Sequence, residues 1–498
     1  MTVITRTNVM SSPQWSDCYR KNKMNHIQQK LYRTFICLVA PLLLATDGLA
    51  VQVVEAAVKP GKEWKPFSTR GMEDLPTAVT AQTNLALTKY GGVLAEKTKA
   101  TSFFHAAKMG GRWFLIDPDG GQFIGIGMSS VTTIRTPGAE AALLQKFGSA
   151  TNWAEQTVKS LRAAGFNMLG AWSDDGAFRK VAQRMPYAKI VSFMGAYGQK
   201  RGGTVQQPGH MGYPEDCIFV FDPDFEKFCK ENAKELAATK NDPWLIGYFS
   251  DNELPFKRDA LRKYLKLPAT DAGYQAAMKL LKARHGANAT TNEITATDEN
   301  DFLGVVVARY FSIVSSAIKK VDPNHLYLGT RLYGSDKSTP EIFKMAGPFV
   351  DVLSVNYYNA WTPDTNRMGM WGQESGRPFI VTEWYAKGVD SGLATTGGAG
   401  WLVKTQRERG LFYQNFTLGL LECPGCVGWF WFKYIDNDPD DTQVDPSNRD
   451  SNKGIVSNRY EPYTPLIEKM TELNRCAYGL ADYFSSQPVK PKSTKSAD

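Results

Sequence analysis

Short apolar runs rich in β-branched residues alternate with amphipathic stretches along most of the chain after residue 100. Runs of this length between helical patterns are typical of buried parallel strands. Because parallel strands need crossover connections, usually helices, the alternation restricts the chain to an α/β fold. We count eight such runs: Phe123–Met128, Asn167–Trp172, Lys189–Phe193, Leu245–Phe249, Leu326–Thr330, Val350–Tyr357, Phe379–Thr382 and Val427–Phe432.

Eight strands alternating with helices predict a (β/α)8 TIM barrel with a short N-terminal extension. A doubly wound open sheet is the alternative. That fold expects a G-x-G-x-x-G loop at its switch point, whereas the chain has only Gly125-Ile126-Gly127. The amphipathic stretches expected as helices are Trp153–Ala164, Asp175–Arg184, Asp224–Thr239, Phe302–Val321, Thr339–Ala346 and Leu402–Leu421.

The first 50 residues have the pattern of a secretory leader. Lys30 and Arg33 precede an apolar stretch, Thr34–Ala45, and small residues follow. This pattern predicts export, to the periplasm or out of the cell, with Met24 as a plausible true start. A membrane anchor or a buried helix is the alternative, but the stretch is too short to span a bilayer comfortably. We therefore expect a leader at 1–50, an N-terminal extension at 51–100, the barrel at 101–484 and a disordered tail at 485–498.

Charge and cysteine content exclude several classes of protein. Without residues 1–50 the chain has 52 basic and 48 acidic residues, which is too balanced to predict nucleic-acid binding. Five cysteines remain outside the leader, an odd number that argues against a disulfide-stapled scaffold. Cys423 and Cys426 have C-x-x-C spacing, but without a second such pair zinc is not expected. The pair could form a local disulfide or a turn leading into the next strand.

Two glutamates stand where apolar strands end. Glu253 lies in FSDNELPF after the fourth run, and Glu383 lies in FIVTEWYAKG after the seventh. An ionised carboxylate is costly to bury unless it is paired or used. Barrel enzymes build their sites at the carboxyl ends of their strands, so both glutamates are expected on one face. Paired carboxylates there predict cleavage of a glycosidic bond, and a structural ion pair is the alternative.

This arrangement resembles clan A of the glycoside hydrolases, which place an Asn-Glu acid/base after strand four and a glutamate nucleophile after strand seven. Asn252-Glu253 and Thr382-Glu383 match these positions. The resemblance implies that Glu253 is the acid/base, that Glu383 is the nucleophile and that configuration is retained. Within the clan the chain resembles glycoside hydrolase family 50, the β-agarases. The passages that carry this resemblance are Gly111–Gly121, Gly165–Ser173, Asp251–Pro255, Asp322–Arg331 and Gly428–Asp438.

Polar and aromatic residues near the other strand ends are expected to bind the sugar. Aromatic rings suit the apolar C–H faces of sugars, and Trp431 is the residue expected to stack beneath the cleaved sugar. Arg331 is expected either to pair with a carboxylate in the site or to receive a sulfated or acidic sugar, and a structural salt bridge is the alternative. The full predicted set of substrate-binding residues is Asn252, Trp172, Arg331, Asn356, Tyr357, Trp384, Trp431 and Lys433.

Two loops after strands three and four are expected to border the cleft. The Gly-rich segment Arg201–Gly212 follows strand three and is expected to form a rim of the cleft. The insertion Leu254–Asp298 follows Glu253 directly and is expected to wall the cleft. The loop Asp436–Asp441 could bind calcium, but it lacks the D-x-D-x-D-G spacing, and a solvated loop is preferred. Scattered histidines disfavour a metal-dependent hydrolase. We expect no metal and no cofactor.

The sequence therefore predicts an exported, retaining glycoside hydrolase that acts on a β-linked, agarose-like galactan or its oligosaccharides. A β-galactosidase or another clan A exo-glycosidase is the second interpretation. A carbohydrate-binding protein on an inactive barrel is the interpretation from a different class. The expected partner is the saccharide substrate, with no nucleic acid and no stable membrane insertion after leader removal. The exact sugar, endo or exo action, acceptance of sulfated sugars and the oligomeric state stay open.

Overall fold

The computed structural model describes residues 52–80, 85–95 and 97–487. The expected leader lies outside the described residues, as does the end of the expected tail, residues 488–498. The last described helix, α14 (Ala477–Ser486), reaches two residues into that tail.

Eight parallel strands form one curled sheet, a TIM-like arrangement that confirms the predicted α/β class. Their order across the sheet is β12-β11-β8-β7-β6-β17-β14-β13, so strands consecutive in this series along the chain are neighbours nearly throughout. Each strand overlaps one of the eight expected runs. They are β6 (Gly125–Met128), β7 (Met168–Leu169), β8 (Tyr187–Val191), β11 (Leu245–Ser250), β12 (Leu326–Tyr327), β13 (Leu353–Asn356), β14 (Phe379–Glu383) and β17 (Cys426–Trp431).

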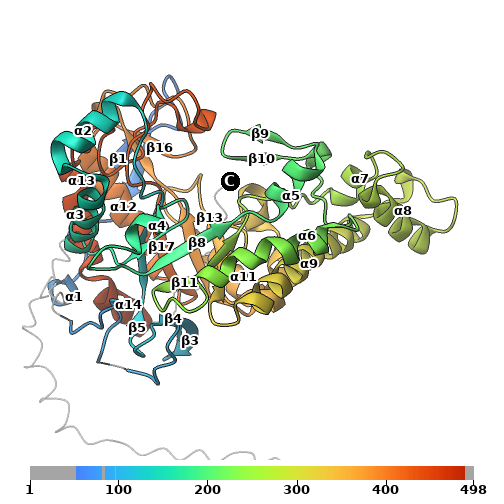
Figure 1. Cartoon of the computed structure of the whole chain (residues 1–498), viewed down its shortest axis with the longest axis horizontal. Coiled ribbons are helices and arrows are strands. Elements are labelled where there is room, and N and C mark those ends of the chain that lie inside the picture. Colours follow the sequence, from blue (N-terminus) through green and yellow to red (C-terminus); the bar gives the residue numbers. More distant parts are fainter. Residues whose placement is uncertain (1–51, 81–84, 96, 488–498) are drawn as a thin grey trace, which may run out of the picture. The chain divides into compact units, whose positions relative to one another are not determined.

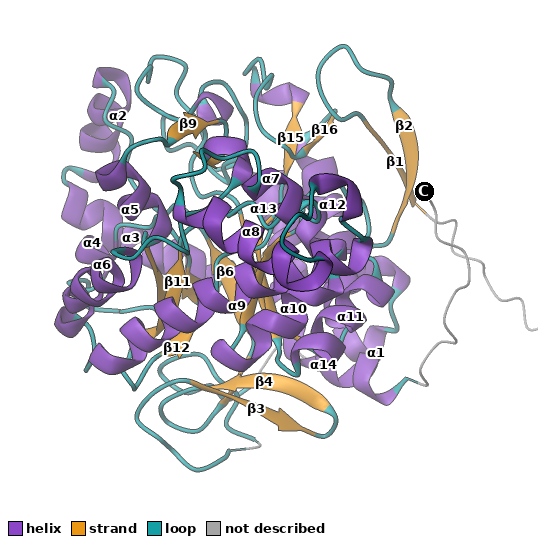
Figure 2. Ribbon diagram, turned by 90° about the vertical axis from the view of Figure 1, so that its right-hand side faces the viewer, coloured by secondary structure: helices purple, strands orange, loops and turns teal. Residues whose placement is uncertain are grey.

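The first expected run, Phe123–Met128, is divided between two sheets. Gln122–Phe123 is β5, which pairs antiparallel with β4 (Arg112–Ile116), and β4 pairs in turn with β3 (His105–Met109). The parallel sheet begins only at Gly125. Figure 2 shows β3 and β4 at the opposite end of the molecule from β9 and β15.

Large apolar side chains fill the interior of the curled sheet. Phe249, Ile246 and Phe430 belong to one buried cluster that continues into Phe123 of the small antiparallel sheet. Burial of this apolar surface stabilises the sheet. Gly127 makes room for the cluster, because a Cβ atom there would lie 2.1 Å from the Phe430 ring.

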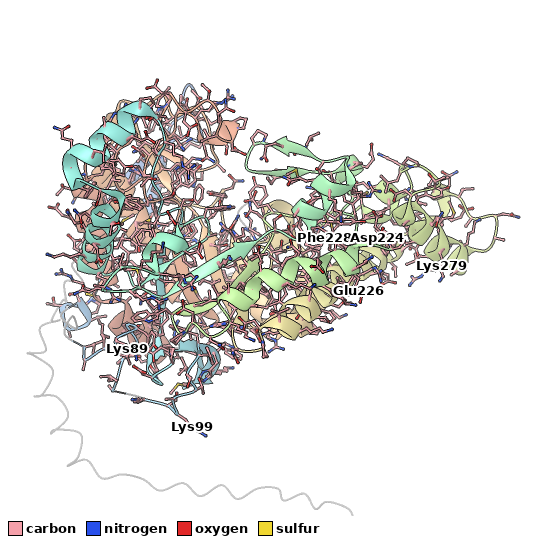
Figure 3. The ribbon with its side chains drawn as sticks, in the orientation of Figure 1. Lys89, Lys99, Asp224, Glu226, Phe228 and Lys279 are labelled. Atoms are coloured by element: carbon pink, nitrogen blue, oxygen red, sulfur yellow. The ribbon has the colours of Figure 1, made fainter. Side chains whose placement is uncertain are left out.

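Helices follow most strands and cover the outside of the sheet (Figure 1). The expected helix Asp175–Arg184 is only a single turn, and Asp224–Thr239 is an α-helix continued by a 3-10 helix. On α6, Phe225 is buried while Glu226 pairs with Lys230, and Figure 3 labels Glu226 there. The helices are α2 (Pro137–Phe147), α3 (Ala150–Ala163), α4 (Asp175–Phe178), α6 (Phe225–Asn232), η3 (Ala233–Ala238), α9 (Ala296–Val321), α10 (Pro340–Ala346), α11 (Thr365–Ser375), α12 (Gln406–Leu421) and α13 (Thr464–Asn474).

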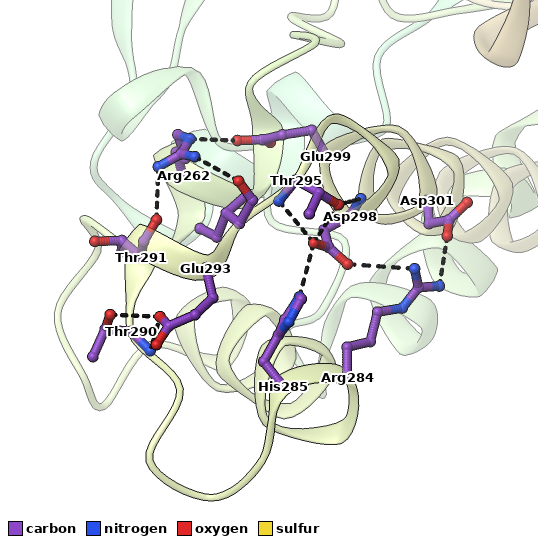
Figure 4. A network of polar contacts seen from close by, with 11 residues as sticks. Arg262, Arg284, His285, Thr290, Thr291, Glu293, Thr295, Asp298, Glu299 and Asp301 are labelled. Carbon is purple, nitrogen blue, oxygen red and sulfur yellow. Dashed lines mark hydrogen bonds and ion pairs between the residues drawn. The ribbon is translucent and has the colours of Figure 1, made fainter.

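The insertion after β11 folds onto the start of α9 through α7 (Ala260–Tyr264) and α8 (Ala272–His285). Figure 4 shows the polar network that fastens it. The Asp298 carboxylate accepts hydrogen bonds from the hydroxyl of Thr295, 2.6 Å, and from Nη1 of Arg284, 3.3 Å, and it contacts Nε2 of His285 at 2.9 Å. The hydroxyl of Thr295, together with His285, holds the pKa of Asp298 well below its usual range.

Helix α9 is long and apolar enough to cross a bilayer by length and composition. Most of its apolar window is nevertheless buried against the rest of the protein, as in the core helix of a barrel.

All five cysteines of the described part are free and buried. Cys423 and Cys426 form the turn into β17, since the N–H of Cys426 donates to the carbonyl of Cys423 at 3.1 Å. The second of the two sequence interpretations, a turn, is therefore the one that the structure has.

The N-terminal extension contributes a two-stranded ribbon, β1 (Gln52–Ala56) and β2 (Lys65–Thr69). It is joined to β16 (Trp401–Val403) by two hydrogen bonds between the backbones of Ala57 and Leu402. These bonds bring the turn between β1 and β2 to the carboxyl-end side of the parallel sheet.

Candidate active site

A cavity of about 630 Å³ lies at the carboxyl ends of the parallel strands. Glu253 follows β11 and Glu383 ends β14, and both line this cavity. The strand ends also supply Ser130, Trp172, Asn252, Tyr358, Asn359, Tyr385, Phe432 and Lys433. The structure thus brings the two predicted catalytic glutamates to one enclosed space. No residue of the insertion 254–298, all of which is described, belongs to the lining, so the expectation that this insertion walls the cleft was wrong.

Glu383 is held by two donors. The guanidinium of Arg331 donates to Oε1, and the hydroxyl of Tyr358 donates to Oε2 at 2.7 Å. Arg331 is fully buried and stacks over the indole ring of Trp172, with its central carbon 4.2 Å from the ring centroid. Of the three interpretations of Arg331 that the sequence offered, the structure shows the pair with a carboxylate of the site.

Burial disfavours the charged form of both partners of this ion pair. It raises the pKa of Glu383 to about 7, while the charge of Arg331 opposes that rise and the charge of Glu253 adds to it. Burial also lowers the pKa of Arg331, against the opposing effect of Glu383. Arg331 and Tyr358 oppose the effect of burial and favour the ionised form that a nucleophile needs.

Glu253 has a different environment. Its Oε1 accepts a hydrogen bond from the side-chain amide of Asn356 at 2.7 Å, and its Oε2 lies 3.6 Å from Nδ1 of His210. The same amide of Asn356 donates to Asn252, 3.3 Å, and its oxygen accepts from the hydroxyl of Thr382 at 2.7 Å. Asn356 is fully buried, so it positions Glu253 from behind the cavity wall.

Several residues of the site have left-handed backbone conformations. Trp172, Glu253 and Arg331 have φ of 59°, 54° and 58°, and Ser130 and Asn359 in the cavity lining are also left-handed. Non-glycine residues adopt this region rarely and at a cost, and such positions cluster at functional sites. The turns immediately after the strands therefore aim these side chains into the cavity at the expense of backbone strain.

Asp251, two residues before Glu253, anchors the end of β11. Its carboxylate accepts hydrogen bonds from the N–H groups of Met194 and Gly195, in the first turn of α5 (Met194–Arg201), and from Tyr310. Negative charge is favourable at a helix N-terminus. This contact fixes α5, and with it the loop that follows, relative to Glu253.

The segment after α5 forms a hairpin of β9 (Val205–Gln207) and β10 (His210–Gly212) over the cavity. Figure 1 shows this hairpin beyond the upper ends of the strands. On one side Asn252 donates to the carbonyl of Gly209, 3.2 Å. On the other side Oδ2 of Asp445, in the loop after β17, accepts from the N–H of Gly209 at 2.8 Å and from Gln206 at 3.0 Å. The hairpin is thus tied to both walls.

Of the three tryptophans predicted to bind the substrate, one lies at the cavity and two lie in the core. Trp172 is 40% exposed and lines the cavity. Trp384 stacks on Phe416, and Trp431 is fully buried with its Nε1 donating to the carbonyl of Lys453. The predictions that Trp384 and Trp431 contact the sugar were wrong, because in this sheet their side chains point into the helix layer.

The prediction that Tyr357 contacts the sugar was wrong for the same reason. Its ring is buried against Trp371 and Phe416, while the next residue, Tyr358, points into the cavity and contacts Glu383. Successive side chains of an extended segment point to opposite sides, so an error of one residue exchanges a core position for a site position. Asn252 and Lys433 line the cavity as expected, whereas Asn356 lies behind it.

The Gly-rich segment Arg201–Gly212 lies at the cavity as predicted, through Gln206, Pro208, Gly209, His210 and Met211. Further cavity residues come from loops and strand ends that no sequence pattern indicated. They are Lys59, Tyr333, Tyr385, Gly398, Ala399, Asp445, Ser447, Asn448 and Lys453.

No group of three metal-ligating side chains occurs among the described residues. In the loop Asp436–Asp441 the carboxylates already have protein donors: Asp436 accepts from Asn452 and Tyr463, and Asp438 pairs with Arg459.

The chain is similar to known proteins in both sequence and fold. No family model matches the chain. It is 27% identical to β-agarase B of Vibrio sp. (strain JT0107) over 84% of the chain, but it spans only 54% of that relative's length. It is 30% identical to the protein in the crystal structure of BpGH50, with a TM-score of 0.75, covering 87% of this chain and 96% of the other. The crystal structure of an agarase, AgWH50C, shares the fold with a TM-score of 0.67 at 24% identity, over 81% and 68% of the two chains.

Proposed function

This chain belongs to glycoside hydrolase family 50, and on that premise we propose that it hydrolyses β-glycosidic bonds of an agarose-like galactan with retention of configuration. The observation that carries the proposal is the unequal environment of two carboxyl groups in one cavity. Glu383 contacts a cation and a phenol, whereas Glu253 accepts from a neutral amide and lies 3.6 Å from the ring of His210. Environments that differ in this way assign the two carboxyl groups different roles.

In the first step the protonated carboxyl of Glu253 gives its proton to the glycosidic oxygen, while the carboxylate of Glu383 attacks the anomeric carbon. The bond to the leaving sugar breaks, and a covalent glycosyl–Glu383 ester forms. In the second step Glu253 takes a proton from water, whose oxygen displaces Glu383 from the anomeric carbon. Two inversions give net retention, and Glu253 regains its proton.

The substrate contacts follow from the placement of the lining residues. We assign Trp172 as the aromatic surface for a sugar ring, because it is the exposed tryptophan at the strand ends. Asn252 is assigned to the sugar hydroxyl beside the scissile bond, the 2-OH. Lys433, which lines the cavity from the loop after β17, is also assigned to the substrate.

We further propose that the sheet closes into a complete (β/α)8 barrel and that the chain belongs to clan A. Support for closure comes from backbone hydrogen bonds that join the two ends of the strand order. The N–H of Leu332, beyond β12, donates to the carbonyl of Ser354 in β13 at 2.9 Å, and the N–H of Val352 donates to the carbonyl of Tyr327 at 3.3 Å. The location of Glu253 after strand four and Glu383 after strand seven is the clan A arrangement. Export by the leader stays part of this proposal.

The test is hydrolysis of neutral agarose oligosaccharides, followed by product mass and by NMR of the first anomer released. We expect turnover with the β-anomer formed first. Glu383→Ala should abolish turnover. Glu253→Ala should retain activity on substrates with good leaving groups and regain turnover with azide, giving a product of retained configuration.

Glu468→Ala, on the exposed face of α13, is the matched control and should behave as wild type. Azide rescue of the Glu383 variant alone would exchange the two roles. Binding of oligosaccharides without turnover by the wild-type protein would favour the carbohydrate-binding alternative. Rapid release of the α-anomer would contradict retention.

A further inference from the structure

Three lysines without carboxylate partners line the cavity. Lys433 and Lys453 line it from the loop after β17, and Lys59 lines it from the turn after β1. The N–H of Lys433 donates to the carbonyl of Lys453 at 3.2 Å, so the two residues are held side by side. Among the described residues none of these three ammonium groups lies within 4 Å of a carboxylate.

The acceptors that these lysines do have are neutral. Nζ of Lys453 donates to the carbonyl of Ser447 at 2.8 Å and to Oδ1 of Asn448 at 2.6 Å. The ammonium of Lys433 has no hydrogen-bond acceptor in the described part of the protein. Asp445 is near, but its oxygens are taken by Gln206, Gly209 and Ser447.

Holding these cations together is unfavourable without an anion. Burial lowers the pKa of Lys433 to about 8 and that of Lys453 to about 7, and the charge of Lys433 lowers the pKa of Lys453 further. Carboxylates beyond contact distance, Asp436 and Asp441 for Lys433 and Glu383 and Asp445 for Lys453, offset these shifts only in part. A sugar hydroxyl can accept a hydrogen bond from an ammonium, but it cannot offset the repulsion between two of them. A bound oxyanion can do both, through charge-assisted hydrogen bonds.

We propose that Lys433 and Lys453, with Lys59 at the rim, form a subsite for an oxyanion substituent of the galactan, a sulfate ester or a carboxylate. The inference rests on the proposed galactan hydrolysis and names its substrate class more closely. Because Lys453 lines the same cavity as Glu383 and its ammonium lies 5.1 Å from the ring centroid of Tyr385, two residues after Glu383, the substituted sugar lies next to the cleaved bond. The sulfate and the carboxylate share the chemistry that the lysines recognise, so the experiment separates them.

The experiment compares kcat/KM on three oligosaccharide series of equal length at one ionic strength: neutral, carrying galactose 6-sulfate, and carrying galacturonate. Wild type is expected to cleave one of the two anionic series at least as well as the neutral one. Lys433→Met and Lys453→Met should each lower the ratio of anionic to neutral kcat/KM by about tenfold or more, the scale of a lost charge-assisted hydrogen bond.

Lys433→Arg keeps the charge and should keep the ratio. Lys404→Met is the matched control, because Lys404 is exposed and pairs with Glu55. If Lys453→Met fails to fold, the comparison of Lys433→Met with Lys433→Arg tests the subsite by itself. Cleavage of the neutral series alone by wild type, or equal losses on all series in the Met variants, overturns the oxyanion subsite while galactan hydrolysis stands. Cleavage of none of the three series would instead overturn the proposed function.

Discussion

Arg331 donates to the carboxylate of Glu383 although β13 lies between β14, which ends at Glu383, and the segment after β12 that holds Arg331. Arg331 follows β12, and Glu383 ends β14. Both side chains are buried, so the contact acts in a medium of low dielectric and little screening. The intervening strand supplies Asn356 to Glu253, and the residue two positions on, Tyr358, contacts Glu383. One short segment therefore touches both carboxyl groups.

Arg331→Met should move the acid limb of the pH profile of kcat/KM to higher pH. Glu383 must be ionised to attack, burial raises its pKa to about 7, and Arg331 is the largest of the effects that lower it. Removing the cation leaves burial and the charge of Glu253 acting against ionisation, so activity should be lost at a higher pH as the solution is acidified.

Tyr358→Phe, which removes a neutral donor, should shift the same limb in the same direction by less. The other charged or titratable groups near Glu383, namely Glu253, Lys453, Lys433 and His210, stay in place in both variants. An unchanged acid limb in a folded Arg331→Met enzyme would mean that Glu383 is not the group that titrates in this limb.

Sequence patterns predicted the strands well and the side chains around them only in part. The eight buried runs and the two glutamates at strand ends could be predicted, because each is a pattern of neighbouring residues in the sequence. Which face Trp431 or Tyr357 presents was not readable, since the registers of β14 against β13 and β17 shift by one residue. The contact of Asp445 with the β9–β10 hairpin joins residues 236 positions apart, and no local pattern encodes it.

Asn356→Ala should lower kcat by about tenfold to a hundredfold, part of the effect of general acid catalysis, with little change in KM. Asn356 is buried behind the cavity and holds Glu253 through one amide. The loss should be largest on substrates with poor leaving groups and smallest on activated aryl glycosides, where protonation matters less. Thr382→Val removes only the donor to Asn356 and should show a smaller effect of the same kind. Equal losses on both substrate types would assign Asn356 to folding alone.

Trp172 and Trp431 should respond to alanine substitution in opposite ways. Trp172 lines the cavity, so Trp172→Ala should lower kcat/KM by the equivalent of about 1.5–3 kcal/mol with little change in Tm. Trp431 is fully buried, so Trp431→Ala should lower the free energy of unfolding by about 3–5 kcal/mol. Steady-state kinetics and denaturant unfolding of both variants check this. A stable Trp431 variant with impaired kcat/KM would return Trp431 to the sugar site.

Asp445→Ala should release the β9–β10 hairpin from the loop after β17. The carboxylate of Asp445 accepts the N–H of Gly209 and the amide of Gln206, and these bonds tie the hairpin to the wall opposite Glu253. Without them, backbone amides of residues 205–212 should exchange with deuterium about tenfold faster, the effect expected when charge-assisted hydrogen bonds are lost.

The same substitution should change substrate choice, because His210 and Gly209 of the hairpin form part of the cavity over Glu253. We expect kcat/KM to fall on short oligosaccharides, because they depend on the contact surface of the hairpin. It should fall less on the long polymer, because a looser hairpin lets the polymer enter the cavity more easily. Asp441→Ala is the matched control, since Asp441 in the same loop accepts only the N–H of Gln443 among the described hydrogen bonds. Hairpin exchange and substrate ratio identical to wild type in Asp445→Ala would show that the cavity is formed without this tie.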